Sequence, residues 1–448
     1  MRKILLGTTA VAGAALFAVS TAQAQQAPTV RIGGFMSTSV AIVDDDLDKA
    51  GGIPTGVNGF GTRARSQTDF RNEVEVHVLV SGKAANGLEY GAVIELQNDG
   101  TGGGAGSALD LDEAYVFLSS PTLGTVRFGE ADSAAGTLAV RAPGIRNFGP
   151  DGAWDVGILG LANGTGGNPS LMTGINDGGD ATKIVYLSPQ FAGFDFGLSY
   201  APNAGEGDRP FFGRPVDTLG AGGAPIAPGL TQRDRTGLEN EISAAIRYRG
   251  TVGGVGIAAG FGYMQADAPT NAVSGSYGFV GAITNVTDQD IKAFTFGLNL
   301  SAFGLTVGGE YTWGKYAQGP VGRTALAAGR DDSSHYVLGA TYTAGALAIG
   351  AYYGVAHVDN GVSSGVTLAD REQTGFGIGA VYTVAPGLEL FANYNVIEDK
   401  NVRFSTTSTT AAPTSGGGIA NPTLAARAAG RLDNRDISAF FIGTRLAF

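Results

Sequence analysis

The sequence predicts an all-β protein, a 16-stranded antiparallel transmembrane β-barrel with long loops on one rim. Runs of about 9–13 residues alternate apolar with small or polar side chains, which is the pattern of a strand with two different faces. The connections between these runs are alternately short and long. After the first segment, no apolar run reaches the roughly 18 residues that a spanning helix needs.

Residues 1–24 have the composition of a signal peptide. Arg2 and Lys3 precede an apolar run, and the small-x-small sequence at 22–24 marks the cleavage site. A transmembrane anchor is the alternative interpretation, and it is disfavoured because no polar cytoplasmic domain follows. Residues 25–448 would then form the mature barrel.

The charge of the mature chain excludes a nucleic-acid partner. The chain has 29 basic and 40 acidic side chains, and loss of Arg2 and Lys3 with the leader leaves a formal charge of −13. It has no cysteine, so an exported form would hold together by burial and hydrogen bonding instead of disulfides.

Sixteen alternating runs follow one another, joined by seven short turns and eight long connections. Short turns on one rim and long loops on the other are typical of an outer-membrane barrel. The predicted strands comprise residues 30–43, 68–80, 88–97, 111–119, 123–131, 182–188, 193–201, 240–249, 254–265, 291–300, 305–313, 334–343, 347–357, 372–383, 388–398 and 436–448.

Aromatic positions distinguish this barrel from a soluble β-sandwich, which shows the same alternation. Tyrosines stand on the apolar faces just before the short turns, and a second set stands near the long loops. Two aromatic belts around an aliphatic band match the two interfaces of a bilayer. The first set is Tyr186, Tyr248, Tyr342 and Tyr382, and the second is Tyr200, Tyr263, Tyr311, Trp313, Tyr353 and Tyr394.

The segment 132–181 has neither a strand period nor a helix period. It is rich in glycine and carries Pro143, Pro150 and Pro169. A structureless connection of this length inside a compact domain is usually functional. We expect it to fold into the barrel and narrow a pore.

The last strand, 436–448, ends on Phe448 and keeps Phe440, Ile442 and Leu446 on the same face. It resembles the C-terminal strand of outer-membrane proteins, which ends in an aromatic residue that the barrel-assembly machinery recognises. Phe448 is therefore the predicted assembly signal.

The chain resembles the Gram-negative general porins of proteobacteria, in particular the alphaproteobacterial branch. The resemblance rests on Gly87-Leu88-Glu89-Tyr90-Gly91-Ala92 with Glu95, on Asp112-Glu113-Ala114-Tyr115-Val116 continuing into Gly124-Thr125-Val126-Arg127-Phe128-Gly129, and on Tyr186-Leu187-Ser188-Pro189 with Gly193 and Ser199-Tyr200. It implies a homotrimer in the outer membrane, in contact with its lipid and lipopolysaccharide. It also implies passive diffusion of ions and small hydrophilic solutes through a channel narrowed by the third long loop, here 132–181.

Two departures from the family pattern concern selectivity. Many relatives carry an arginine after the glycine that corresponds to Gly129, where this chain has Glu130. The PEFGG-like turn of the inserted loop is replaced by Ile145-Arg146-Asn147-Phe148-Gly149.

Alternation predicts which charges face the lumen. Glu73 and Glu75 lie opposite Val74 and Val76, whereas the direction of Glu113 stays open because it shares a face with two aromatic residues. The acids predict a mild cation preference, and wall charges paired with one another are the alternative. The predicted pore-lining and constriction residues are Glu73, Glu75, Glu89, Glu95, Glu130, Arg141, Arg146, Asp151, Asp155, Lys183, Arg247, Arg249 and Arg445.

We expect no cofactor other than a structural calcium ion, considered at Asp177 and Asp180, where glycines would let carbonyls turn toward an ion. Solvated loop acids are the alternative. Small inward residues on the later strands should leave space for water, and they are Gly256, Ala258, Gly260, Gly308, Gly350, Gly354, Gly375, Gly377 and Gly379.

The sequence disfavours two other classes of function. A lipid-hydrolysing barrel needs a nucleophile beside a histidine on the lipid face, but the neighbours of the outward His357 are Val355 and Tyr353, so we predict no enzyme. A structural or adhesive barrel would have a filled lumen. The alternative that stays open is a substrate-selective outer-membrane channel with a solute-binding lane.

Overall fold

The computed structural model describes residues 27–45, 67–98, 110–145, 175, 181–203, 238–268, 272–273, 283–284, 289–316, 326, 329–363, 366–403 and 432–448. The predicted signal peptide lies outside these residues. Within the described part, no helix is both long enough and apolar enough to span a membrane.

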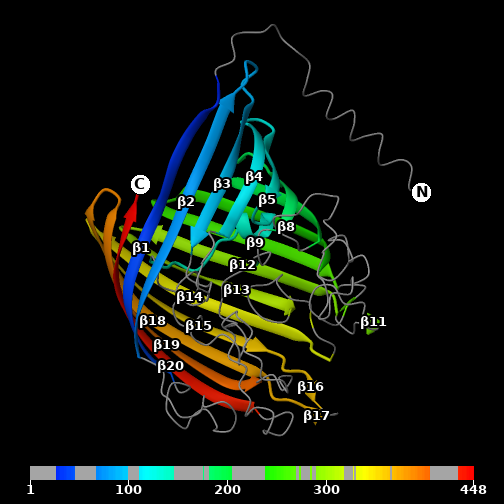
Figure 1. Ribbon diagram of the computed structural model, residues 1–448, viewed down its shortest axis with the longest axis vertical. Coiled ribbons are helices and arrows are strands. Elements are labelled where there is room, and N and C mark those ends of the chain that lie inside the picture. The colour runs from blue at the N-terminus through cyan, green and yellow to red at the C-terminus, as the bar shows by residue number, and fades with distance from the viewer. Residues whose placement is uncertain are drawn as a thin grey trace, which may run out of the picture.

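The protein is a closed barrel of sixteen antiparallel strands, which confirms the predicted fold. Every barrel strand pairs with its sequence neighbours, and β1 also pairs with β20 to close the sheet (Figure 1). The strands are β1 Thr29–Asp45, β2 Thr68–Lys83, β3 Glu89–Asn98, β4 Asp110–Ser120, β5 Gly124–Glu130, β6 Thr182–Leu187, β7 Phe194–Asn203, β8 Glu239–Val252, β9 Val255–Asp267, β12 Ile291–Ala302, β13 Leu305–Lys315, β14 Asp332–Ala344, β15 Leu347–Val358, β18 Arg371–Ala385, β19 Leu388–Arg403 and β20 Leu432–Ala447.

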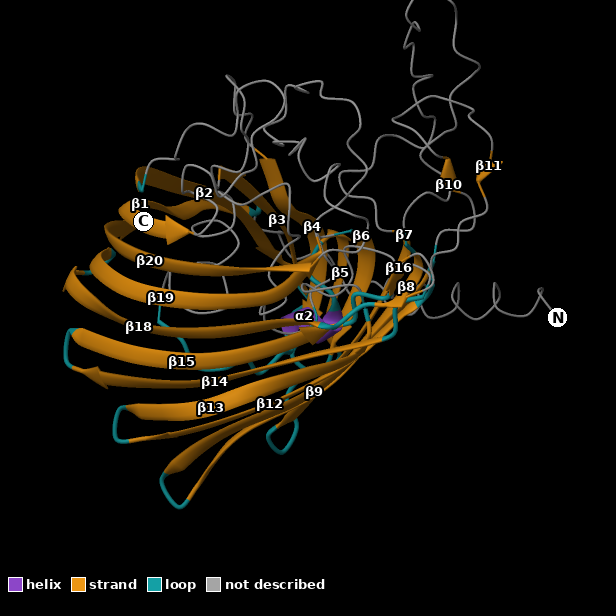
Figure 2. Cartoon of the chain, turned by 90° about the horizontal axis from the view of Figure 1, so that it is seen from below, coloured by secondary structure: helices purple, strands orange, loops and turns teal. Residues whose placement is uncertain are grey.

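Three small elements lie in the long connections. The pairs β10 Ala272–Val273 with β11 Ile283–Thr284, and β16 Val362–Ser363 with β17 Val366–Thr367, form two-stranded sheets that the alternation did not predict. The helix α2, Ala134–Thr137, lies in the predicted inserted loop. Figure 2 shows α2 enclosed by the barrel strands.

The short turns fix the register of their hairpins. In the turn between β12 and β13, Phe303 and Gly304 both have positive φ, 54° and 80°. Two consecutive residues with positive φ are typical of a type I′ turn, whose twist matches the twist of the two antiparallel strands that it joins. Phe303 is 99 % exposed at this rim.

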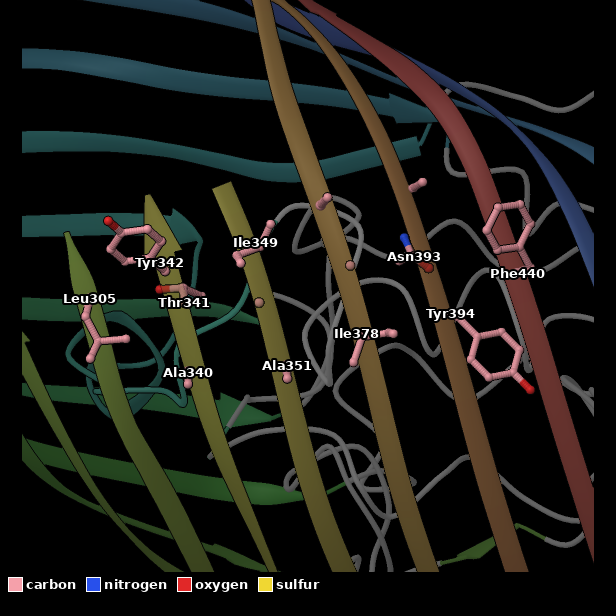
Figure 3. A pocket seen from close by; sticks show the side chains of 14 residues that line it. Leu305, Ala340, Thr341, Tyr342, Ile349, Ala351, Ile378, Asn393, Tyr394 and Phe440 are labelled. Carbon is pink, nitrogen blue, oxygen red and sulfur yellow. The ribbon is translucent and has the colours of Figure 1, made fainter. Parts of the chain in front are cut away.

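Every barrel strand presents exposed apolar side chains on the outer face, as a lipid-facing surface requires. At the long-loop end, Trp313 stacks with Tyr311 (ring centroids 5.1 Å apart) and with Phe294 (5.6 Å). On the same outer face, nearer the short turns, the small side chains of Ala340 and Ala351 border a groove of about 610 Å³ (Figure 3). The larger residues that border it include Leu305, Tyr342, Ile349, Ile378, Tyr394 and Phe440.

Many of the buried apolar side chains form two clusters on the inner face. One cluster includes Met264, Ile291 and Tyr316, whose hydroxyl hydrogen-bonds to Nδ1 of His335 (3.1 Å). Burial raises the pKa of the Tyr316 phenol. The second cluster lies on β14, β15, β19, β20 and β1, and Ile145 of the inserted loop packs against it. The loop thus bridges two packed regions of the interior.

Candidate functional site

The first turn of the inserted loop is fixed to the inner wall of the barrel. Ser133 caps α2 by accepting a hydrogen bond from the amide of Gly136 (3.2 Å). The next free amides reach the wall: Ala134 donates to Oγ of Ser199 (3.0 Å) and Ala135 to Oγ of Ser243 (2.8 Å). These serines lie on the inward faces of β7 and β8, so the predicted inward fold of the loop is confirmed for its described part.

Beyond the helix, the loop runs across the inner faces of further strands with its main chain close to theirs. Nδ2 of Asn299 on β12 donates to the carbonyl of Arg141 (2.9 Å). A Cβ atom on Gly297 would overlap the carbonyl oxygen of Val140, and one on Gly339 would overlap that of Pro143. Only glycine permits such an approach between two backbones.

This contact corrects one expectation about the small inward residues. Gly260 lies against the side chain of Val140, and Gly350 and Gly379 lie against Ile145. Gly308 makes room for the side chain of Asn299, which holds the loop. At these positions the missing side chain accommodates the loop, whereas open space for water had been expected.

An acidic wall lies on β2 and β3. Glu75 and His77 share the inward face of β2, and Nε2 of His77 contacts Oε1 of Glu75. His77 stands opposite Glu95 in the register between β2 and β3, and Glu73 continues the same face. The structure therefore brings three of the predicted acids onto one part of the inner wall.

Glu113, whose direction the sequence left open, belongs to this wall. Val116 and Leu118 of β4 are exposed on the outer face, so Glu113 and Tyr115 face inward. The Glu113 carboxylate accepts a hydrogen bond from the amide of Asp132 (3.1 Å), at the start of the inserted loop. The guanidinium of Arg127 on β5 lies over the ring of Tyr115, 4.8 Å from its centroid.

The predicted basic residues on β6 and β8 form hydrogen bonds with other groups of the inner wall and the base of the loop. Lys183 is buried, and its ammonium donates to the carbonyl of Ala131 (2.6 Å) beneath the loop. Arg247 makes two hydrogen bonds to Asp195 on β7 (3.2 and 2.7 Å), and Arg249 donates to the same carboxylate (3.0 Å). Two arginines thus share one acid that the sequence analysis missed.

Of three other predicted residues, two lie near the rim of the short turns and one is buried. Glu89 pairs with Lys83 (3.1 Å) next to a short turn, and both side chains are exposed. Arg445 lies near the same rim with its guanidinium 4.0 Å from the ring centroid of Phe35. Glu130, at the end of β5, is only 8 % exposed.

Of the predicted loop charges, Arg141 is half-buried and its carbonyl accepts the hydrogen bond from Asn299. The remaining loop charges lie outside the described residues. They are Arg146, Asp151, Asp155, Asp177 and Asp180, including both candidate calcium ligands.

A buried ion pair between β18 and β19 was not predicted. Arg371 donates to both oxygens of Asp399 (2.8 and 2.6 Å), and Gln373 donates to one of them (2.8 Å). Residue 399 lies past the predicted end of its strand, at 398, so alternation was not extended to it. Periodicity continued by a single residue would have placed it on the inward face.

A closed apolar-faced barrel with a loop fixed across its interior is the architecture of a channel-forming outer-membrane protein. The chain matches the family described as Gram-negative porin over residues 7–402, and it belongs to that family. It is therefore an outer-membrane porin, and the family expected from the sequence is confirmed.

Solved structures support the fold at low sequence identity. An anion-selective porin from Comamonas acidovorans is 16 % identical, with a TM-score of 0.51, over 94 % of this chain and 100 % of its own. The outer-membrane expressed OmpT of Vibrio cholerae is 12 % identical, with a TM-score of 0.52, over 96 % and 99 %. A trimer form of OmpT is 14 % identical, with a TM-score of 0.51, over 94 % and 100 %. No curated protein matches the chain.

Proposed function

We propose that this porin passes ions and small hydrophilic solutes by passive diffusion, with a mild preference for cations. The observation that carries the preference is the inward group of Glu73, Glu75, Glu95 and Glu113 on three neighbouring strands. A water-filled passage with low-dielectric walls concentrates ions of the opposite charge.

The basic residues oppose this field only in part. Lys183 is buried against a backbone carbonyl, and Arg247 and Arg249 share the Asp195 carboxylate. Arg249 keeps half of its side chain exposed, so some positive charge still faces the lumen. The preference should therefore be weak, and salt should screen it, since the Debye length is about 10 Å at 0.1 M.

The test is the zero-current potential of the wild type across a planar bilayer under a KCl gradient, with a chelator present. A potential of the sign for potassium preference is expected, shifting toward zero in Glu75→Gln/Glu95→Gln. Glu89→Gln is the matched control, because that acid pairs with Lys83 at the rim. Anion selectivity in the wild type, or equal shifts in both variants, contradicts the proposal.

Glu130 is the less suitable position for this test, although the departure from the family pattern points to it. Its side chain is buried, so Glu130→Arg would bury a second large cation near Lys183 and disturb the base of the loop. A changed potential in that variant would mix a charge effect with a displaced loop.

A substrate-selective channel is the alternative, and it would need exposed aromatic or polar side chains in an ordered lane. The inward Tyr352 and Phe441 are instead buried in one cluster of the wall, which favours general diffusion. We propose transport without catalysis: the outward His357 lies 3.9 Å from Glu372, and both are exposed at the loop rim.

We also propose a homotrimer, in contact with outer-membrane lipid and lipopolysaccharide and inserted by the barrel-assembly machinery. The support is the trimer form of a structure with the same fold. Native mass measurement in mild detergent should give three chains per particle, and a monomer would contradict this.

A further inference from the structure

Glu75, His77 and Glu95 form a compact set of ligand atoms on the inner wall, one strand away from Glu113, which binds the start of the inserted loop. One ligand atom from each side chain lies within 4.8 Å of the others. Two of the residues alternate on one strand and the third stands opposite, because His77 of β2 pairs with Glu95 of β3 (Figure 1). All three side chains are partly exposed, so ions in the lumen can reach them.

The neighbouring strands leave space on one side of this set and place further acids on the other. On the β1 side, the residue opposite His77 is Gly33, which has no side chain. On the β4 side, the register shifts between Ile94 and Leu96, where two residues of β4, Asp112 and Glu113, stand opposite the single residue Glu95. Such a bulge re-aims side chains relative to the regular ladder, and here the extra residue lies on β4.

The donor set suits a divalent cation. It combines two carboxylates with an imidazole, and two further carboxylates, those of Asp112 and Glu113, lie on β4 beside Glu95. Asp112 is itself held by Gln97 (2.7 Å), and Glu113 by the Asp132 amide. Like charges along a low-dielectric wall repel, and a bound cation removes that repulsion.

We propose that Glu75, His77 and Glu95 bind a divalent transition-metal cation of the zinc class. Imidazole favours such ions over calcium and magnesium, which take oxygen ligands. Ligand atoms that each bind one ion at about 2.0–2.2 Å lie roughly 3–4 Å from one another. The present ligand atoms lie within 4.8 Å of one another, so side-chain movements of about 1 Å would complete the site. Three protein ligands leave the ion open to water.

Binding would also change the pore. A bound divalent cation adds positive charge to this part of the inner wall, so it should reduce the flow of monovalent cations. This consequence rests on the proposed ion preference, whereas binding itself does not, and the two are measured separately.

The test is calorimetric titration of the detergent-solubilised, chelator-treated full chain with ZnCl₂, and with CoCl₂ for its visible absorption. One site per chain is expected. His77→Gln and Glu95→Gln should each weaken binding by about tenfold or more, since even the loss of a group outside the ligand shell typically costs that much. Gel mobility with and without heating checks that each variant is folded.

Two matched controls locate the site. His357→Gln removes an exposed histidine elsewhere, and Glu89→Gln removes an exposed inward acid of β3, so both should bind as the wild type does. Unchanged binding in folded His77→Gln, or displacement of zinc by an equal concentration of calcium, would show a diffuse acidic surface and overturn the proposal.

Discussion

Gly297 on β12 lies directly beneath the carbonyl oxygen of Val140, with no room for a Cβ atom between the wall and the inserted loop. Two residues along the same strand, Asn299 hydrogen-bonds to the carbonyl of Arg141 (2.9 Å). The loop is therefore packed as part of the interior, and its position depends on particular residues of the wall.

Substitution of Gly297 should displace the loop. In Gly297→Ala the new methyl group collides with a backbone atom, which should lower stability by about 1–3 kcal/mol and change single-channel conductance. Gly256→Ala is the control, because a Cβ there would lie at an ordinary 3.6 Å from Ser301. Identical conductance and unfolding midpoints for both variants would show that the loop is not held by this approach.

Lys183 should support the start of the loop. Lys183→Met removes the donor to the Ala131 carbonyl and leaves that oxygen buried, at a cost of about 1–3 kcal/mol in the free energy of unfolding. Lys83→Met, which breaks only an exposed pair with Glu89, should cost less than about 1 kcal/mol. Urea unfolding followed by tryptophan fluorescence compares them, and equal losses would contradict the buried role.

Asp399 should be sensitive to loss of its charge. Asp399→Asn leaves the buried guanidinium of Arg371 without its ion-pair partner, which should cost roughly 3–5 kcal/mol. Arg371→Met/Asp399→Leu should recover much of this loss, because both buried charges are removed together. Thermal unfolding on gels measures the series, and a double variant no more stable than Asp399→Asn would refute the account.

Phe448 should matter both for closure and for recognition during assembly. Its amide and carbonyl exchange hydrogen bonds with Gly34 (3.0 and 3.1 Å), while its side chain is 63 % exposed. Deletion of Phe448 should lower the yield of folded, heat-modifiable protein in cells more than deletion of residues 414–418. Phe448→Ala keeps the backbone bonds, so it should refold normally in detergent and fail mainly in cells. Equal cellular yields for the two deletions would remove the assembly role.

The strands could be predicted because successive side chains point alternately to the lipid and to the interior. Lipid requires apolar side chains, whereas water and the inserted loop favour polar or small ones. Tyr342 and Thr341 fall on the faces that alternation assigns to them. On β4, where aromatic residues share the inward face with Glu113, alternation left the direction open. The short sheets β10–β11 and β16–β17 were missed because two-residue strands carry no period.

The pairing of charges could be predicted only where a short turn fixes the register. Glu95 meets His77 across a hairpin with a short turn, so their proximity follows from the turn and the alternation. Asp195 meets Arg247 across strands joined by a long loop, which leaves the register free, and the sharing of one acid by two arginines was not foreseen. The path of the loop has no periodicity at all, so the role of the wall glycines emerged only from the structure.

The wall recognises the main chain of the loop at several points: Gly297 faces the carbonyl of Val140, Gly339 faces that of Pro143, and Asn299 binds that of Arg141. Carbonyl groups are common to all residues, so these three contacts do not depend on which side chains the loop carries. The side chains of Val140 and Ile145 do pack against wall glycines. Substitutions elsewhere in the loop should therefore alter the filter of the pore while the barrel and the anchoring of the loop stay unchanged.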